Sequence, residues 1–375
     1  MRILYVTDQL YLFGGAEKIL TQKLNYWADV FEYDVMVVTS SQFGKAPFFK
    51  LSNKVKHIDL GIDYPDGSLY HPRNFKRFSQ HYKKLKATIS DYNPDGVFVL
   101  SQRLPNIITP FAAGKIPAFY ELHTSWRGFK NNYDAQPAIY RIKTRILDAI
   151  TRFAENRYSK IVYLNPTELS LFNRKNGIVI PNFYDDSLPQ PVETRKKSVV
   201  TLGRLSYEKR YDRLLDAWKL LDEKIEGWEL FIFGDGVERE KLERQQNATV
   251  WRNPVHLPGA TSEPAKKLAE SSIYALSSQV ETFPMALLEA LSNGLPIVSF
   301  DCESGPRHII TAGEDGILVP SEDVKALSDA LLELMQNDEE RARMSQRAKQ
   351  NVKRFNAAAI MARWDELLKN TIAAK

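Results

Sequence analysis

The stretch that decides the fold is SVVTLGRLSYEKRYDRLLDAWKLLD, residues 198–222. Its β-branched run at 198–203 predicts a buried strand, and the apolar spacing over 210–222 predicts an amphipathic helix. Strand, short loop and helix make up the first part of a βαβ unit. Such units build a parallel sheet whose faces are covered by helices.

The same alternation continues on both sides of this stretch. Toward the N-terminus, strands are expected at 2–7, 33–39, 96–100, 117–122 and 160–164, with helices at 15–28, 72–90, 104–113 and 136–158. Toward the C-terminus, strands are expected at 228–233, 255–257, 272–276 and 296–300, with helices at 237–246, 284–292, 322–335, 338–354 and 357–370. We therefore predict an α/β fold of two Rossmann-like, doubly wound domains facing across a cleft, with the C-terminal helix returning to the first domain. The expected boundaries are 1–182 for the first domain, 183–197 for a linker, 198–355 for the second domain and 356–375 for the C-terminal helix.

Composition and charge describe an ordinary folded protein of 375 residues, with 43% apolar and 26% charged residues. Residues 1–180 carry 25 Lys and Arg against 15 Asp and Glu, whereas residues 181–375 carry 26 against 31, so the first half is basic and the second acidic. The single cysteine, Cys302, cannot form an intramolecular disulfide, which fits a reducing cytoplasm. We find neither a signal-peptide core nor a window apolar enough to span a membrane, so we expect a protein that is soluble or bound to a membrane surface.

Glycines and cations occupy the predicted strand-to-helix loops. Gly14 and Gly15 open the helix after the first strand, where backbone N–H groups can approach an anion. A tight turn without a ligand is the alternative. Arg204 follows the strand at 198–203 and Lys209 stands where the next helix begins, so a diphosphate could lie between a guanidinium and an ammonium group. The alternative here is a pair of solvated surface cations.

Two glutamates frame the strongest motif, ETFPMALLE at 281–289. Pro284 is a good first residue for a helix and Thr282 could cap it, which would place Glu281 in the loop before the helix and Glu289 inside it. We expect Glu281 to hydrogen-bond sugar hydroxyls, the free N–H groups of the first turn to face an anion, and Glu289 to accept two ribose hydroxyls. A solvated pair of glutamates on a helix face is the alternative, which the apolar character of this helix disfavours.

Together these segments resemble a known family. The segments at 14–17 (GGAE), 203–204 (GR) with Lys209, 281–289, 294–298 (GLPIV) and 316–320 (GILVP) are similar to the family-4 retaining glycosyltransferases of the GT-B fold. The sequence departs from the family at Arg210, where glycine often follows the motif lysine, and at Thr282-Phe283-Pro284, where the family often has Pro-Phe-Gly or Gly-Phe-Gly. The segment at 304–307 (SGPR) resembles members that act in bacterial surface polysaccharide or glycan assembly.

The resemblance implies a glycosyltransferase (EC 2.4) that moves a sugar from a nucleotide-sugar, with a UDP-sugar expected, to a saccharide acceptor, with retention of configuration. It implies an acceptor-side first domain and a nucleotide-sugar-binding second domain. Within the second domain, it implies that Arg204 and Lys209 neutralise the diphosphate, Glu289 holds the ribose and Glu281 grips the transferred sugar. The other donor-binding residues that it implies are the backbone of Phe283, Pro284 and Met285 around the sugar, and Pro258 and Gly259 beside the nucleobase.

His123 follows the predicted strand at 117–122, where the family often has a histidine facing the donor sugar. A structural histidine is the alternative, and the neighbouring Glu121 could serve instead. Breaking the bond from the sugar to a nucleoside diphosphate leaves negative charge on the phosphates, which Arg204 and Lys209 would stabilise. The sequence has no Asp-x-Asp metal pair and no His/Cys cluster, and Asp185-Asp186 lie in the expected linker, so we expect a metal-independent reaction without a cofactor.

Basic amphipathic segments in the first half of the chain suggest where the acceptor is bound. They lead us to expect docking on the inner face of an anionic membrane and a lipid-linked saccharide acceptor, with an ordinary solvated helix face as the alternative. A nucleic-acid-binding protein is a rival reading, which the lack of any recognised nucleic-acid motif disfavours. A GT-B epimerase, a phosphorylase and an inactive sugar-binding module also stay open. The basic residues are Arg73, Lys76, Arg77, Lys83, Lys84 and Lys86 in 71–90, and Arg141, Lys143, Arg145, Arg152, Arg157 and Lys160 in 136–160.

Overall fold

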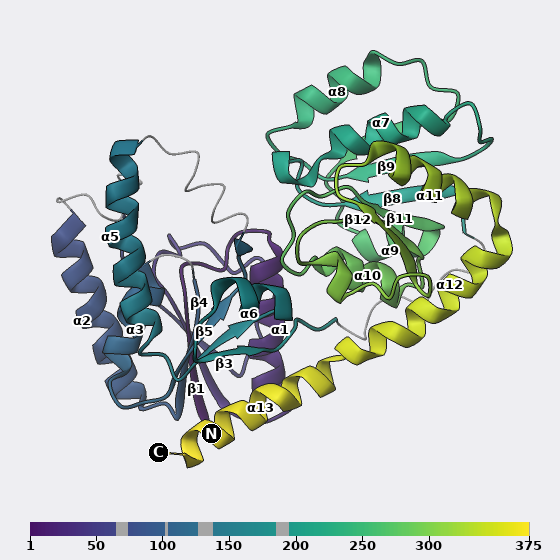
Figure 1. Cartoon of the computed structure of the whole chain (residues 1–375). Coiled ribbons are helices and arrows are strands. Elements are labelled where there is room, and N and C mark those ends of the chain that lie inside the picture. The colour runs from purple at the N-terminus through teal and green to yellow at the C-terminus, as the bar shows by residue number, and fades with distance from the viewer. Residues whose placement is uncertain (65–73, 102–103, 127–137, 185–194, 375) are drawn as a thin grey trace. The chain divides into compact units, whose positions relative to one another are not determined.

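The computed structural model describes residues 1–64, 74–101, 104–126, 138–184 and 195–374, with only the backbone of 138–144. Contacts within the chain divide it into two units (Figure 1). Unit 1 comprises Met1–Pro181 with Ile360–Lys375, and unit 2 comprises Asn182–Ala359. Most of the predicted linker, at 185–194, lies outside the described residues.

Unit 1 is built on a parallel sheet of seven strands in the order β3-β2-β1-β4-β5-β6-β7. The strands, in that order, are Val55–Asp59, Asp34–Thr39, Arg2–Thr7, Gly96–Leu100, Ala118–Leu122, Lys160–Tyr163 and Gly177–Val179. The helices are α1 (Gly15–Asp29), α2 (Phe75–Tyr92), α3 (Leu104–Ala113), α5 (Ala138–Glu155), α6 (Pro166–Phe172) and α13 (Ala357–Ala373).

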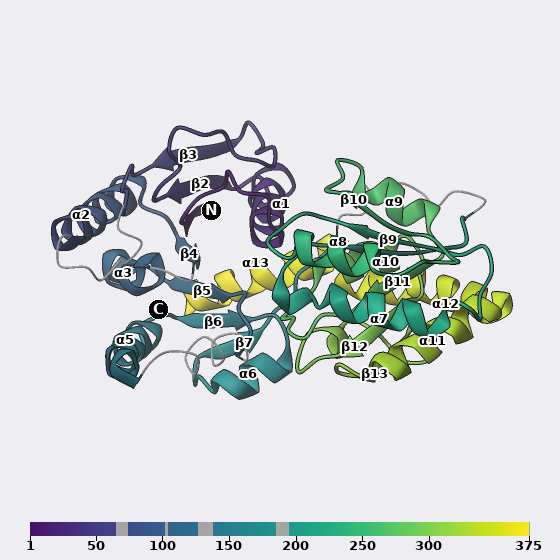
Figure 2. The ribbon, with the colours of Figure 1, turned by 90° about the horizontal axis from the view of Figure 1, so that it is seen from above.

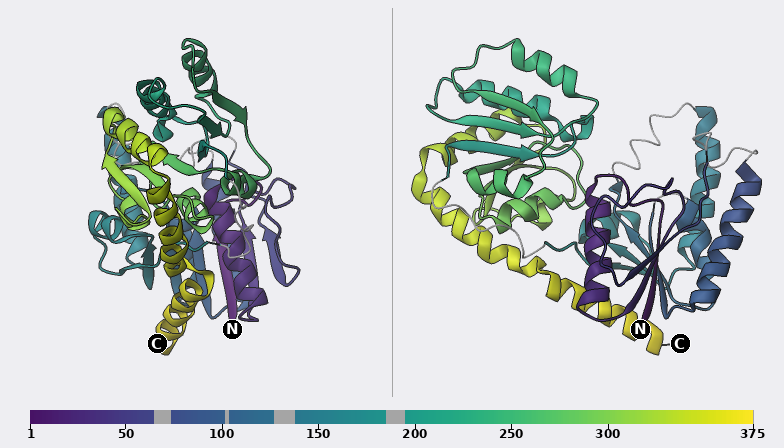
Figure 3. Two further views of the ribbon diagram at one scale, coloured as in Figure 1. Left: turned by 90° about the vertical axis from the view of Figure 1, so that its right-hand side faces the viewer. Right: turned by 180° about the vertical axis from the view of Figure 1, so that it is seen from behind.

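Both faces of this sheet are covered, which explains why its central strands are mostly apolar. Helices α2, α3 and α5 lie on one face, where Leu4, Val97 and Tyr120 join their core (Figure 2). Helices α1 and α13 lie on the other face, where the rings of Trp27 and Trp364 both contact Phe98 (Figure 3). The predicted return of the C-terminal helix to the first domain is thereby confirmed.

Unit 2 has a second parallel sheet, of six strands in the order β10-β9-β8-β11-β12-β13. The strands, in that order, are Val255–Gly259, Glu229–Phe233, Ser198–Leu202, Ile273–Leu276, Ile297–Asp301 and Gly316–Pro320. The helices are α7 (Tyr211–Leu221), α8 (Arg239–Asn247), α9 (Pro264–Glu270), α10 (Met285–Ser292), α11 (Val324–Gln336) and α12 (Asp338–Asn351), with 3-10 turns η2 (Tyr207–Lys209), η3 (Pro306–His308) and η4 (Val352–Phe355). Helices α7 and α11 cover one face and α9 and α10 the other (Figure 1).

The strand order of unit 2 locates its ligand-binding edge. Chain order within the unit runs outward from β8 through β9 to β10, then returns to the other side of β8 with β11. The order therefore reverses between β8 and β11, and open α/β sheets bind ligands outside the carboxyl ends of the strands at such a point. Both units confirm the predicted Rossmann-like, doubly wound architecture.

Candidate active site

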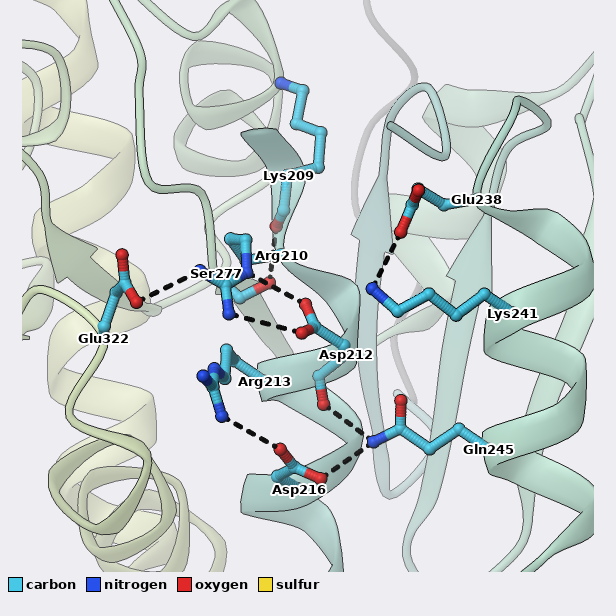
Figure 4. Close-up of polar contacts among 10 residues, drawn as sticks. All are labelled: Lys209, Arg210, Asp212, Arg213, Asp216, Glu238, Lys241, Gln245, Ser277 and Glu322. Carbon is cyan, nitrogen blue, oxygen red and sulfur yellow. Dashed lines mark hydrogen bonds and ion pairs between the residues drawn. The ribbon is translucent and has the colours of Figure 1, made fainter. Parts of the chain in front are cut away.

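The loops that leave β8 and β11 meet at the switch point of unit 2. The Gln279 N–H donates to the Glu208 carbonyl at 2.8 Å. The Ser277 hydroxyl donates to the Lys209 carbonyl at 2.9 Å, as Figure 4 shows. These two bonds join the predicted diphosphate loop to the predicted sugar-binding loop.

Lys209 and Glu281 form an ion pair, with Nζ 2.6 Å from Oε1. Their side chains are 23% and 11% exposed, so water reaches the pair but does not surround it. Burial opposes the charge of Lys209, but the Glu281 carboxylate outweighs burial and holds the pKa of Lys209 above its usual range. Lys209 is therefore a cation at neutral pH. The sequence analysis assigned these two residues to different parts of the donor and did not predict that they pair.

Arg204 lies two residues after the end of β8 and is exposed, as expected for a group that meets an anion from solution. The loop around it is packed tightly against the Gly234-Asp235-Gly236 segment after β9. A Cβ on Gly234 would lie 1.8 Å from the Gly203 carbonyl oxygen, and one on Gly236 would lie 2.4 Å from the Leu205 carbonyl oxygen. The sequence analysis missed these two glycines, although Gly-Asp-Gly directly after a strand signals a turn of this kind.

Glu281 is held from two sides. The Ser278 hydroxyl donates to its Oε1 at 2.8 Å, while its backbone carbonyl accepts the Ser304 hydroxyl at 2.7 Å and the Gly305 N–H at 3.0 Å. A Cβ on Gly305 would lie 2.8 Å from the Glu281 Cβ, so only glycine permits this approach. Ser304 and Gly305 belong to the segment noted for its resemblance to surface-glycan enzymes, but their contact with Glu281 was not predicted.

Helix α10 starts later than predicted. Its N-cap is Pro284 in an extended conformation, with ψ 108°, and Thr282 does not cap it, so both parts of that prediction were wrong. The proline ring has no oxygen with which to cap the helix, and Pro284 makes no side-chain cap hydrogen bond. The Phe283 ring packs against Phe355 at 5.6 Å between centroids, so only the backbone of Phe283, Pro284 and Met285 is left to act as predicted.

Two other predicted donor groups lie in unit 2. Glu289 is inside α10, as expected, and is partly buried. Pro258 and Gly259 end the edge strand β10, where the Gly259 carbonyl accepts the Gly234 N–H at 2.9 Å. That bond ties their loop to the Gly-Asp-Gly turn and thereby to the segment that carries Arg204.

The predicted residues of unit 1 are Gly14, Gly15 and His123. Gly14 caps α1 in an extended conformation and Gly15 begins the helix. The Glu17 carboxylate already lies over this helix start, because a Cβ on Gly14 would be 2.3 Å from Glu17 Oε2. The Gln9 amide donates to the other carboxylate oxygen of Glu17 at 2.6 Å. A carboxylate therefore stands where an anion was expected.

His123 follows β5, as predicted, and its ring lies 3.3 Å from a Glu121 carboxylate oxygen. Glu121 is buried with the ammonium of Lys23, and the Tyr5 hydroxyl donates to it at 3.0 Å. Burial lowers the pKa of His123 more than the Glu121 carboxylate raises it. The imidazole is therefore neutral at pH 7. Within the described residues, no group of three His, Cys, Asp or Glu could hold a metal ion. No helix among the described elements is long and apolar enough to cross a membrane.

Comparison with known proteins shows similarity to glycosyltransferases. Residues 185–351 match the family model described as glycosyl transferases group 1. The chain is 27% identical over 399 residues to the amylovoran biosynthesis glycosyltransferase AmsD of Erwinia amylovora, covering 98% of this chain and 99% of AmsD. It is 26% identical to an uncharacterized glycosyltransferase of Haemophilus influenzae, covering 95% of this chain and 96% of that relative.

Solved structures extend the similarity to the whole fold. Anabaena HepE in complex with UDP matches with a TM-score of 0.76 at 17% identity, over 99% of this chain and 100% of HepE. Staphylococcus aureus TarM, in complex with UDP and other ligands, matches with a TM-score of 0.77 at 14% identity, over 98% of this chain and 99% of TarM. The chain thus has the GT-B fold, and its residues 185–351 are similar to the glycosyl transferases group 1 family.

Proposed function

We propose that this protein transfers a sugar from a UDP-sugar to a saccharide acceptor in the assembly of a bacterial surface polysaccharide or glycan, with retention of configuration and without a metal. The observation that carries the proposal is the Lys209–Glu281 ion pair at the switch point of unit 2. It puts a cation and a hydrogen-bond acceptor at adjacent positions, as a sugar diphosphate requires.

The chemistry follows from the flow of charge. The bond between the anomeric carbon and the diphosphate oxygen breaks, and its electron pair stays on the diphosphate. The acceptor hydroxyl oxygen bonds to the anomeric carbon and gives up its proton to the departing diphosphate oxygen. Arg204 and Lys209 stabilise the leaving diphosphate, so that group needs no general acid. Glu281 accepts hydrogen bonds from sugar hydroxyls, and neutral His123 serves as a hydrogen-bonding partner of the sugar.

The relatives support the choice of substrates. HepE and TarM were solved with UDP, and HepE also with UDP-glucose. One relative, 26% identical over 56% of this chain, is a poly(ribitol-phosphate) alpha-N-acetylglucosaminyltransferase of Staphylococcus aureus. These names support a UDP-sugar donor and a surface-glycan acceptor as the proposed substrates of this chain.

An acceptor site on unit 1 is supported by exposed aromatic rings at the carboxyl edge of its sheet. Phe13 and Phe48 come from the loops after β1 and β2, with centroids 5.2 Å apart. The Phe48 N–H donates to the Leu10 carbonyl at 2.8 Å, and the Leu10 N–H donates to the buried amide of Gln42 at 2.9 Å, so the two loops are bonded together. Apolar rings displayed on such a scaffold suit the C–H face of a saccharide.

The test is a donor screen followed by a transfer assay. Nucleotide-sugars are ranked by how much they raise the unfolding temperature, and the best donor is then assayed with and without saccharide acceptors. We expect Arg204→Ala and Lys209→Ala each to lower kcat about a hundredfold or more with folding preserved, while Arg213→Gln, which alters a surface pair, has no effect. Normal transfer by both alanine variants would contradict the proposal. Conversion of the nucleotide-sugar without an acceptor would indicate an epimerase instead.

We further propose that unit 1 docks on an anionic membrane surface through α2 and α5. Ile146, Ile150 and Phe153 form a stripe on α5 at i, i+4 and i+7, and they are 58%, 45% and 58% exposed. The Arg157 guanidinium covers the Phe153 ring, and Arg152 lies on the same helix. An apolar stripe flanked by cations suits a membrane interface. Of the basic residues behind the prediction, Arg73 and the side chains of Arg141 and Lys143 lie outside the described part.

Vesicle flotation tests this docking. We expect binding to vesicles that contain phosphatidylglycerol but not to pure phosphatidylcholine vesicles, and we expect Ile150→Glu to abolish it. Leu220→Glu is the matched control, because Leu220 is also a half-exposed apolar helix residue but lies in unit 2. Equal binding to both kinds of vesicle would refute the proposal.

A further inference from the structure

Arg210, the residue after Lys209, has a left-handed backbone with φ 49° and ψ 42°. Glycine adopts this conformation freely, whereas a residue with a Cβ adopts it at a cost. The sequence analysis noted that related enzymes often have glycine here. Arginine at such a position needs surroundings that compensate the cost, and residues of this kind gather at functional sites.

Two carboxylates compensate the cost of the left-handed conformation of Arg210. Arg210 Nε lies 3.1 Å from Asp212 Oδ1, and its two terminal nitrogens lie 3.3 Å from Asp212 Oδ2 and 3.0 Å from Glu322 Oε2 (Figure 4). The arginine side chain is 7% exposed, so these contacts are shielded from water. A guanidinium that donates to two carboxylates in one plane is held in both position and orientation.

Glu322 is itself left-handed, with φ 65°. It stands between β13 and α11, while Arg210 stands between η2 and α7. The ion pair thus joins two strained, non-glycine positions in loops far apart in the sequence, next to the contact between helices α7 and α11. The same bond that holds residue 210 in its unusual conformation also holds residue 322.

The conformation of residue 210 determines where Lys209 points. The Arg210 N–H donates to the Tyr207 carbonyl at 3.3 Å, and the Lys209 N–H donates to the Ser206 carbonyl at 3.0 Å, so the turn closes directly on the lysine. The Lys209 carbonyl is fixed by Ser277, and its ammonium lies beside Glu281. A change of backbone at 210 would rotate the peptide that carries these contacts.

We infer that Arg210, clamped by Asp212 and Glu322, is a positioning residue that fixes the Lys209 ammonium beside Glu281 for the donor diphosphate. This inference rests on the proposed function for the identity of that ligand. In this proposal Arg210 acts through Lys209, because its own guanidinium is engaged by Asp212 and Glu322. It replaces a freely left-handed glycine by a residue that is left-handed only while its ion pairs are formed.

Four variants distinguish the effect of the left-handed backbone at residue 210 from the effect of its ion pairs. Arg210→Gly keeps the left-handed conformation but removes the ion pairs, Arg210→Ala removes both, and Glu322→Gln keeps Arg210 while removing the charge opposite it. Arg213→Gln, one turn along α7, is the control. The measurements are hydrogen exchange at the amides of 206–210 and the Kd for UDP.

We expect Arg210→Gly, Arg210→Ala and Glu322→Gln to exchange faster at 206–210 and to bind UDP about tenfold more weakly, with Arg213→Gln unchanged. We also expect the donor KM to rise while the acceptor KM is kept, which a general loss of structure would not produce. Wild-type exchange and UDP affinity in Arg210→Gly would overturn the inference, because backbone shape alone would then suffice. If the wild-type protein does not bind UDP, the proposed donor is wrong and the exchange rates alone decide whether Arg210 fixes the turn.

Discussion

Replacing Lys23 by methionine should destabilise unit 1 strongly at pH 7. The side chains of Lys23 and Glu121 are each 1% exposed, and the Lys23 ammonium also lies 4.3 Å from the centroid of the Trp364 ring. Removing one partner of a fully buried pair costs about 3–5 kcal/mol, because it leaves an uncompensated charge. Glu121 would keep its bonds from Tyr5 and His123, so we expect about 3 kcal/mol, measured as the loss in free energy of urea-induced unfolding.

The pH dependence of that loss provides a sharper test. In the wild type, burial alone would raise the pKa of Glu121, but the Lys23 charge prevails and lowers it to about 2. A depressed carboxylate pKa contributes stability above the unfolded value of about 4.5, and this stability is lost as the pH falls toward 2. Without Lys23, burial dominates and the folded pKa rises above 4.5, so the variant gains stability as the pH falls. The difference between variant and wild type should therefore shrink between pH 7 and pH 5.

The control is Arg152→Met, which breaks a pair with Asp148 whose side chains are 52% and 30% exposed. We expect it to cost at most about 0.5 kcal/mol. The double variant Lys23→Met with Glu121→Gln should recover more than half of the loss, since no charge is left buried. A loss below about 1 kcal/mol for Lys23→Met, or one that does not change with pH, would refute this account of the pair.

Three further outcomes are expected. Gly305→Ala would put a Cβ 2.8 Å from Glu281 and 2.9 Å from Pro284, so it should lower the free energy of urea-induced unfolding by about 1–3 kcal/mol and slow sugar transfer. A wild-type free energy of unfolding together with a wild-type transfer rate would contradict this account of the contact. Burial, aided by the nearby Lys84 charge, lowers the pKa of His81 to about 4. As the pH falls below 6.5, the unfolded chain therefore takes up a proton before the folded protein does, and the free energy of unfolding should drop by about 3 kcal/mol between pH 6.5 and 4. The variant His81→Gln should lack that drop. Burial raises the pKa of the Cys302 thiol to about 12, so iodoacetamide at pH 8 should label it only after unfolding, as mass spectrometry would detect.

Helices and strands with a clear hydrophobic periodicity could be predicted from the sequence, whereas short elements and edge strands could not. The β-branched run and amphipathic helix of 198–222 correspond to β8 and α7, with ends within a residue of those expected. Strand β3 was missed because VKHID is a half-exposed edge strand whose polar residues conceal the alternation. Helices α6 and α9 were missed because each has only seven residues, although Pro166 and Pro264 begin them as proline commonly does.

The charged residues of the candidate site could be found from the sequence, but the contacts between them could not. A cation after β8 and a glutamate after β11 were both found from the sequence, since each stands at the end of a buried strand. Their ion pair depends on β8 and β11 being neighbours in the sheet, which strand order in the chain does not reveal. The hydroxyls of Ser277 and Ser304 were missed for the same reason, because serine is common in loops and only its partner gives it a role.

The position of Trp364 has a consequence for how the chain folds during synthesis. The ring that covers Lys23 comes from the part of α13 that follows unit 2 in the sequence. Gly96 of β4 likewise lies so close to this helix that a Cβ would be 2.6 Å from Leu368. A ribosome makes the sheet of unit 1 first, but cannot supply the last layer of its core until unit 2 has emerged. One aromatic face of the nascent unit 1 sheet therefore stays uncovered until α13 has been synthesised.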